Sequence, residues 1–250
     1  MPGYPKHEAH AVFHKMEVRH YDLLGERMGD GNTVAIVITN PNNPCGSVYT
    51  SEHLAKIADI ASKLGILVIA DEVYGHLVYG TTPFVPMVFS RLSRNHFGSY
   101  IKRWAVVDSL RSFVSIISGP ATFIQGAIPH IIRNTNDEFY DNIVKLLKET
   151  AEICYDAIKE IKCITCPHKP EGSFFMMVKL DVSQFSDICD DVDFCSKLAK
   201  EESVILLPGK SLGMENWLRI TFASEPPTLK QGLERVKSFC RRHQSQANLC

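Results

Sequence analysis

The stretch between residues 34 and 71 constrains the fold more than any other part of this 250-residue chain. Residues 34–39 and 66–70 are short, mostly aliphatic runs, which are typical of strands buried on both faces. Between them, Thr50 can cap an amphipathic helix that Gly65 would end. Such a strand–helix–strand unit is almost always right-handed, with parallel strands. Both strands should therefore end at one edge of the sheet, where open α/β sheets bind their ligands.

The rest of the chain predicts a different arrangement of helices and strands. Helices are expected over residues 124–132, 139–161 and 228–243, and strands over residues 173–180, 204–207 and 216–222. Strands and helices mixed at these shorter spacings indicate a smaller α+β domain. We place a boundary near Asp137, so that residues 1–137 form part of a large α/β domain with a mainly parallel sheet. Residues 138–250 would then form a bridging helix and the small domain.

Composition argues against several classes of protein. The 27 Lys and Arg residues nearly balance the 28 Asp and Glu residues, so there is no broad basic field for a nucleic-acid backbone. No apolar run approaches the ~18 residues that a membrane helix needs, and the first residues lack the apolar core of a signal peptide. We therefore expect a cytoplasmic protein that binds neither nucleic acid nor membrane, and whose 8 cysteines are reduced thiols.

Cys163 and Cys166, with His168 close by, have the spacing of a metal or redox site. A zinc site would need a fourth ligand and usually a second such pair, and the sequence offers none. We therefore interpret the two cysteines as structural and predict no metal site.

Three polar side chains are expected to meet at the edge of the parallel sheet. Asp71 ends the second strand, Tyr74 follows it closely, and Asn43 lies in the loop after the first strand. A carboxylate at the end of a buried strand is costly unless it meets a cation, which a protonated aromatic nitrogen would supply. Alone, Asp71 could cap a turn and Tyr74 could be a packing residue. Their expected convergence favours a site for the nitrogen and phenolic oxygen of a pyridine ring.

Lys102 and Arg219 are two further candidate residues. A lysine with apolar neighbours can have a lowered pKa and form imines, but spacing alone does not distinguish Lys102 from an ordinary exposed lysine. Arg219 is centred in an apolar strand and needs an anion. That anion could be the carboxylate of a ligand or of an internal salt bridge.

Four segments of the chain resemble, in this order, motifs of the fold-type I, pyridoxal-phosphate-dependent aminotransferases. They are Asn-Pro-Asn-Asn-Pro-Cys-Gly at residues 40–46, Asp-Glu-Val-Tyr-Gly-His at 71–76, Ser-Tyr-Ile-Lys-Arg-Trp at 99–104 and Asn-Trp-Leu-Arg-Ile-Thr-Phe at 216–222. The likeness is strongest to plant tyrosine aminotransferases and their carbon–sulfur lyase relatives. Residues 119–125 and 170–173 of this chain also fit the pattern of that subgroup. It covers nearly the whole chain apart from residues 88–106.

The resemblance implies the cofactor pyridoxal 5'-phosphate and a role for each candidate residue. Lys102 would bind the cofactor covalently and move the proton between the substrate Cα and the cofactor. Asp71 would keep the pyridine nitrogen protonated. Tyr74 and Asn43 would hydrogen-bond the phenolic oxygen, and Ser99 would contact the phosphate.

The resemblance also implies a reaction. Arg219 would clamp the α-carboxylate of the substrate, and an amino group would pass from tyrosine or another aromatic amino acid to a 2-oxo acid in a homodimeric enzyme. Two alternatives stay open: β-elimination by a cysteine-conjugate carbon–sulfur lyase, and an inactive homologue that at most associates with full-length subunits. A nicotinamide-binding protein is disfavoured because no G-x-G-x-x-G follows a predicted strand.

The chain departs from the family pattern in several places. It begins near Pro2-Gly3-Tyr4-Pro5, a motif that lies well inside family members, and further gaps follow Leu24 and Trp104. Ile101 stands where a second serine is expected, and Arg111 has the wrong surroundings for the family's phosphate-binding arginine. We expect a truncated and internally deleted chain in which apolar surface and strand edges of the large domain are uncovered.

Overall fold

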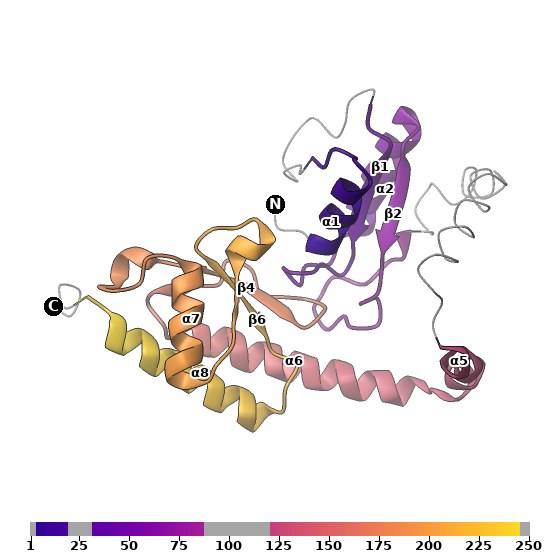
Figure 1. The fold of residues 1–250 in the computed structure, drawn as a ribbon. Coiled ribbons are helices and arrows are strands. Elements are labelled where there is room, and N and C mark those ends of the chain that lie inside the picture. The colour runs from indigo at the N-terminus through magenta and orange to yellow at the C-terminus, as the bar shows by residue number, and fades with distance from the viewer. Residues whose placement is uncertain (1–3, 20–31, 88–120, 246–250) are drawn as a thin grey trace.

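The computed structural model describes residues 4–19, 32–87 and 121–245, which build two separate sheets (Figure 1). The elements in chain order are α1 (Pro5–Phe13), β1 (Ala35–Thr39), α2 (Ser51–Leu64), β2 (Leu67–Asp71), α5 (Thr122–Asn134), α6 (Asp137–Lys159), β3 (Ile164–Thr165), β4 (Phe175–Leu180), the 3-10 helix η3 (Val182–Gln184), α7 (Asp191–Glu202), β5 (Leu207–Pro208), the 3-10 helix η4 (Gly209–Leu212), β6 (Trp217–Thr221) and α8 (Pro226–His243). None of the described helices is long and apolar enough to cross a membrane.

The predicted strand–helix–strand unit is confirmed. Strands β1 and β2 are parallel, and their register ends with Thr39 opposite Asp71. The Thr50 side chain accepts a hydrogen bond from the backbone N–H of His53 at 3.2 Å, which caps α2. Gly65 ends the helix in the left-handed conformation with φ 67°. Local signals in the sequence therefore fix both ends of the crossover helix.

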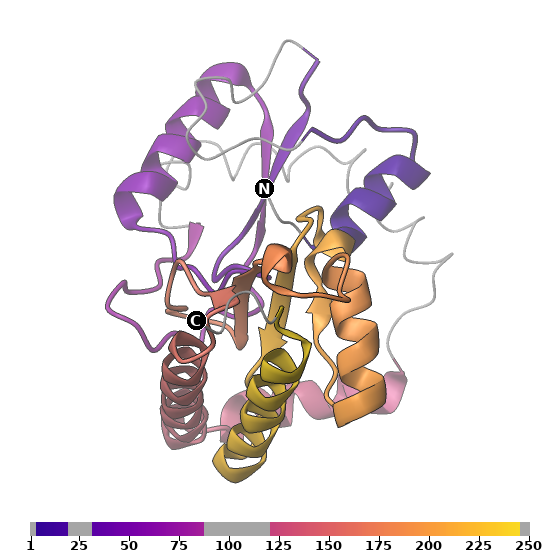
Figure 2. The same cartoon turned by 90° about the vertical axis from the view of Figure 1, so that its left-hand side faces the viewer.

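The prediction that both strands are buried on both faces was wrong, since β1 is buried on one face only and β2 is more exposed. Ile36 and Ile38 of β1 are buried beneath α2, which lies to one side of the two strands (Figure 2). On β2, in contrast, Leu67 is 46% exposed and Ile69 45% exposed, and Val37 of β1 is 40% exposed. These three side chains are therefore partly uncovered in the described structure, as expected for exposed apolar surface of the large domain.

The second sheet has the strand order β3-β4-β6-β5 and is antiparallel throughout. Its core includes side chains from α6, α7 and α8, with Phe194, Phe222 and Phe239 fully buried. The sequence analysis did not predict α1 or α7, and the strand expected over residues 204–207 is reduced to the two residues of β5. The other expected helices and strands are present with ends shifted by a few residues. The boundary near Asp137 stays a prediction.

The two sheets are joined at a contact that we call the junction, formed by residues 40–46, 77–82 and 170–173. The carbonyl oxygen of Gly46 accepts hydrogen bonds from the N–H groups of Glu171 at 2.8 Å and Gly172 at 2.9 Å. Val78 forms an isolated antiparallel bridge with Gly172. The Tyr79 hydroxyl donates to the carbonyl of Gly172 at 3.1 Å. Backbone N–H and carbonyl groups from the two sheets' neighbouring loops therefore hydrogen-bond to one another at the junction.

We predict that Gly46→Ala weakens the junction. Gly46 has φ 70°, and a Cβ atom there would lie 2.5 Å from Cβ of Pro170 and 2.7 Å from the carbonyl oxygen of Phe175. The left-handed backbone costs an alanine about 1 kcal/mol and the overpacking about 1–3 kcal/mol. Urea unfolding should therefore show a loss of at least about 2 kcal/mol in the free energy of unfolding.

Gly65→Ala is the matched control. Gly65 has a similar φ of 67°, but a Cβ atom there would meet nothing within 4 Å. This variant should lose only about 1 kcal/mol. Equal losses in the two variants would contradict the close approach at Gly46.

Candidate functional site

The carboxyl ends of β1 and β2 lie side by side, as predicted. The N–H of Asn40 donates to the backbone carbonyl of Asp71 at 2.9 Å. The Asp71 side chain, 27% exposed, accepts from the N–H of Val73 at 3.4 Å. Its second oxygen lies 3.4 Å from Nε2 of His7, which belongs to α1. The strand-end carboxylate therefore faces a ring that can become a cation.

The loop after β1 is built from buried amide side chains. Asn40, Asn42 and Asn43 are 2%, 7% and 6% exposed. Oδ1 of Asn40 accepts from the N–H of Tyr49 at 3.0 Å, and Oδ1 of Asn42 accepts from the N–H of Cys45 at 3.1 Å. The side chains of Asn40 and Asn42 therefore stabilise the conformation of the loop. The amide of Asn43 points elsewhere, toward β6 of the second sheet.

Arg219 of β6 contacts this loop. Its Nη1 donates to Oδ1 of Asn43 at 3.2 Å, and its guanidinium carbon lies 4.3 Å from the centre of the Phe175 ring. Burial lowers the pKa of Arg219 from its ordinary value. Nε is buried without a hydrogen-bond partner, and Arg219 takes part in no carboxylate ion pair found within the described ranges.

The surroundings of Arg219 show no internal carboxylate partner within the described residues. A neutral amide and a ring face hold the guanidinium, so its charge is not balanced by a carboxylate in this part of the chain. Buried charges are normally paired, and a guanidinium with a free N–H is suited to a carboxylate or phosphate. The arrangement can bind an anionic ligand.

Tyr74 completes the cluster. Burial raises the pKa of its hydroxyl, and a hydrogen bond with Asn43 opposes this effect. The charge of Asp71 raises the pKa of this hydroxyl further, and the charge of Arg219 lowers it. The structure therefore places Asn43 beside Tyr74 and Arg219, and Asp71 at the same edge of the sheet. The sequence predicted this meeting for Asn43, Asp71 and Tyr74, and the resemblance added Arg219. Lys102 and Ser99 lie outside the described residues.

The sequence analysis missed two residues of this neighbourhood, both at the start of the chain. His7 contacts Asp71, and the rings of Tyr4 and His7 meet edge to face at 5.5 Å between centroids. Tyr4 is also near enough to Tyr74 to influence the pKa of its hydroxyl. Helix α1 has no buried residue, so the sequence lacks the periodic apolar positions that would have predicted this helix.

The side chains of Cys163 and Cys166 do not converge. The thiol of Cys166 donates to the carbonyl of His168 at 3.2 Å, whereas Cys163 shares a hydrogen bond with Cys240 of α8. Within residues 4–19, 32–87 and 121–245, no group of three or more His, Cys, Asp or Glu side chains could hold a metal ion.

Glu171 holds residues 81–82, which follow Tyr79, against the second sheet through hydrogen bonds. Its Oε1 accepts from the N–H and hydroxyl of Thr81 at 3.0 and 2.9 Å, and its Oε2 accepts from the hydroxyl of Thr82 at 2.7 Å. Burial alone would raise the pKa of Glu171, but the hydrogen bonds from Thr82 and Thr81 outweigh it and lower the pKa. The ionised carboxylate thus helps to hold the junction that aligns Asn43 with Arg219.

Comparison with known proteins gives a consistent result. The family model described as "Aminotransferase class I and II" matches residues 2–236. Nicotianamine aminotransferase 1 of Oryza sativa subsp. japonica is 53% identical over 98% of this chain and 57% of its own length. S-alkyl-thiohydroximate lyase SUR1 of Arabidopsis thaliana is 38% identical over 97% of this chain and 60% of its own length. This chain therefore spans less than two thirds of either relative.

The fold is also found in solved structures. Tyrosine aminotransferase from Leishmania infantum superimposes with a TM-score of 0.82 at 27% identity. The superposition covers 98% of this chain and 68% of that chain.

We predict that Glu171→Gln destabilises the protein in a pH-dependent way. A lowered pKa in the folded state means that the carboxylate contributes stability above its unfolded pKa of about 4.3, and that this contribution is lost as the pH falls through the folded pKa. Because the carboxylate is partly exposed, the loss in free energy of unfolding at pH 7 should be about 1 kcal/mol. Urea unfolding at pH 7 and pH 3 measures it. A difference from wild type that stayed constant between these pH values would refute the role of the charge.

Proposed function

This chain belongs to the class I and II aminotransferase family, and on that premise we propose that it transfers an amino group from an amino acid to a 2-oxo acid with pyridoxal 5'-phosphate as cofactor. The observation that carries the proposal is the partly buried guanidinium of Arg219, whose Nε has no hydrogen-bond partner within the described residues and which lies beside Asn43 and Tyr74. An uncompensated cation next to an amide and a phenol is suited to a ligand that carries a carboxylate.

The described residues fit the cofactor. Its protonated pyridine nitrogen needs a carboxylate, and Asp71 offers one at the sheet edge. Its phenolic oxygen needs polar partners, and the hydroxyl of Tyr74 and the amide of Asn43 lie close enough to affect one another. When bound, pyridoxal phosphate withdraws electrons from the substrate Cα and so makes its proton easier to remove.

We assign the remaining steps to residues of this chain. Nζ of Lys102 would hold the cofactor covalently until the amino group of the substrate displaces it, and would then move the proton from the substrate Cα to the C4′ carbon of the cofactor. The Ser99 hydroxyl would bind the phosphate. The guanidinium of Arg219 would bind the α-carboxylate, and the Phe175 ring at 4.3 Å supports the plane of that guanidinium. A carboxylate fixed in this way orients the Cα–H bond for proton removal.

The amino donor that we propose is tyrosine or another aromatic amino acid. Three rings gather beside Arg219: Tyr74 meets Phe174 edge to face at 5.3 Å and Phe175 at 6.0 Å. Such rings favour contact with an aromatic side chain. The 53% identity to a nicotianamine aminotransferase favours nicotianamine as a second candidate donor. Assays of 2-oxoglutarate-dependent amino transfer from each donor decide between them.

A carbon–sulfur lyase is the second candidate activity, favoured by the 38% identity to S-alkyl-thiohydroximate lyase SUR1. Both reactions begin with removal of the Cα proton and would use the same lysine and carboxylate. Release of pyruvate and ammonia from a cysteine conjugate without an added 2-oxo acid would favour the lyase. A chain that binds no cofactor but associates with a full-length subunit would favour the inactive homologue.

We further propose that the protein is a cytoplasmic homodimer. Exposed apolar side chains on β2 and on α5, which has no buried residue, offer surface that a second copy could cover. Sedimentation velocity of the purified chain measures its oligomeric state.

Lys102→Ala should abolish covalent binding of the cofactor. Wild-type protein mixed with pyridoxal phosphate should gain visible absorbance and, after borohydride reduction, a mass increase that maps to Lys102. The exposed Lys148 of α6 provides the control, since Lys148→Ala should leave both signals intact. Unchanged absorbance and mass labelling in Lys102→Ala would reject the assignment of that lysine.

Arg219→Lys should raise the KM for the amino donor while cofactor absorbance stays unchanged. Lysine keeps the charge but loses the two parallel hydrogen bonds to a carboxylate, worth about 2 kcal/mol, so KM should rise about thirtyfold. Arg235→Lys is the control, because Arg235 donates to the carbonyl of Glu202 instead. If both variants had the wild-type KM, Arg219 would not bind the substrate carboxylate.

A further inference from the structure

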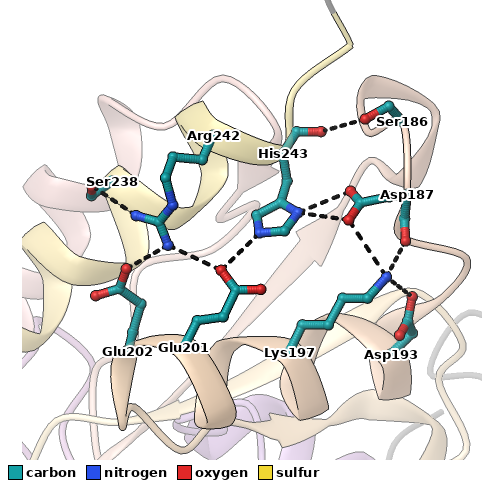
Figure 3. Close-up of polar contacts among 9 residues, drawn as sticks. All are labelled: Ser186, Asp187, Asp193, Lys197, Glu201, Glu202, Ser238, Arg242 and His243. Carbon is teal, nitrogen blue, oxygen red and sulfur yellow. Dashed lines mark hydrogen bonds and ion pairs between the residues drawn. The ribbon is translucent and has the colours of Figure 1, made fainter.

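A second polar cluster lies where α8 ends against α7 (Figure 3). His243 is the last residue of α8, and its ring lies between two carboxylates. Nδ1 is 2.9 Å from each carboxylate oxygen of Asp187, and Nε2 is 3.1 Å from Oε2 of Glu201. The side chain is 13% exposed, and its ring packs at 4.2 Å from the centre of the Phe239 ring. Both ring nitrogens therefore have an acceptor within hydrogen-bond distance.

This geometry favours the protonated ring. A neutral imidazole carries one N–H and can donate to only one carboxylate, whereas the imidazolium donates to both. The positive charge also lies at the carboxyl end of α8, where the helix dipole favours a cation. Burial by itself lowers the pKa of His243, but the hydrogen bonds to Asp187 and Glu201 outweigh it and raise the pKa.

Neighbouring cations keep the two carboxylates ionised whether or not the ring is protonated. The other charged groups that face the cluster are Arg242 on α8 and Asp193, Lys197 and Glu202 on α7. Arg242 lies 3.2 Å from Glu201, and Lys197 lies 3.7 Å from Asp187. Hydrogen bonds to His243 come first among the causes that lower the pKa of Asp187 and of Glu201, and the two cations add to them. The group that titrates near neutral pH is therefore the imidazole.

Backbone contacts depend on the same turn. The carbonyl of His243 accepts from the N–H of Ser186 at 3.1 Å, and the N–H of Ser245 donates to the carbonyl of Gln184 at 2.9 Å. We propose that His243 is a pH-dependent latch: its imidazolium fastens the end of α8 to α7 and to residues 184–187, and loss of the proton loosens that attachment.

The sign of the pH dependence follows from the raised pKa. A group whose pKa is higher in the folded than in the unfolded state contributes its full stability below the unfolded value, about 6.5 for histidine. That contribution disappears as the pH rises through the folded pKa. The latch is therefore closed in mildly acidic solution and loosens toward alkaline pH.

The test compares wild type with His243→Gln in urea unfolding at pH 6 and pH 9. Glutamine can donate to one carboxylate but carries no charge. At pH 6 the variant should have an unfolding equilibrium constant about five- to thirtyfold larger than wild type, the range for a partly buried cation at a helix end. At pH 9 the ratio should fall toward about one. His168→Gln, at an exposed histidine, should give a ratio near one at both pH values.

Two further measurements keep the test decisive if His243→Gln fails to fold. NMR titration of the wild-type His243 ring should give a pKa above the ordinary 6.5. Exchange of the Ser186 and Ser245 amides should accelerate, beyond its intrinsic pH dependence, as that ring loses its proton. The double variant Asp187→Asn/Glu201→Gln retains the histidine but lacks both carboxylates. In this variant the pKa of His243 should return toward 6.5. A wild-type pKa at or below 6.5, or an unfolding ratio that is the same at pH 6 and pH 9, would overturn the latch.

Discussion

The backbone carbonyl of Gly46 lies at the centre of the contact by which the two sheets of this protein meet. It accepts two N–H groups from the turn before β4, and the glycine is needed because a Cβ atom would collide with Pro170. This contact sets the loop after β1 against the second sheet. The amide of Asn43, in the loop that follows the first sheet's β1, consequently reaches the guanidinium of Arg219 in the second sheet.

The candidate site carries an energetic cost that a purely structural role does not explain. Arg219 is partly buried, its pKa is lowered, and its Nε has no partner within the described residues. Exchanging such a group for an apolar side chain of similar size is often neutral or stabilising. A bound carboxylate would supply the missing charge and hydrogen bonds, which connects the stability of this region with its proposed function.

Local signals explain what the sequence predicted, and tertiary contacts explain what it missed. Thr50 and Gly65 mark the ends of α2, and the parallel crossover places Asp71 beside Asn40. Helix α7 was missed although its buried positions, from Asp191 to Leu198, follow a helical period. The contact between His7 and Asp71 could not be predicted, because it depends on segments distant in sequence. Likewise, no pattern indicates which anion Arg219 meets. The resemblance identified the family, but its roles for Lys102 and Ser99 stay predictions.

A double-mutant cycle on Asn43→Ala and Arg219→Met tests most directly whether the junction brings the two halves of the site together. The free energies of unfolding of wild type, both single variants and the double variant give the coupling between the two side chains. The hydrogen bond at 3.2 Å across the junction predicts a favourable coupling of about 1 kcal/mol. Additive effects, within about 0.3 kcal/mol, would show that the two side chains do not meet and would contradict the assembled site.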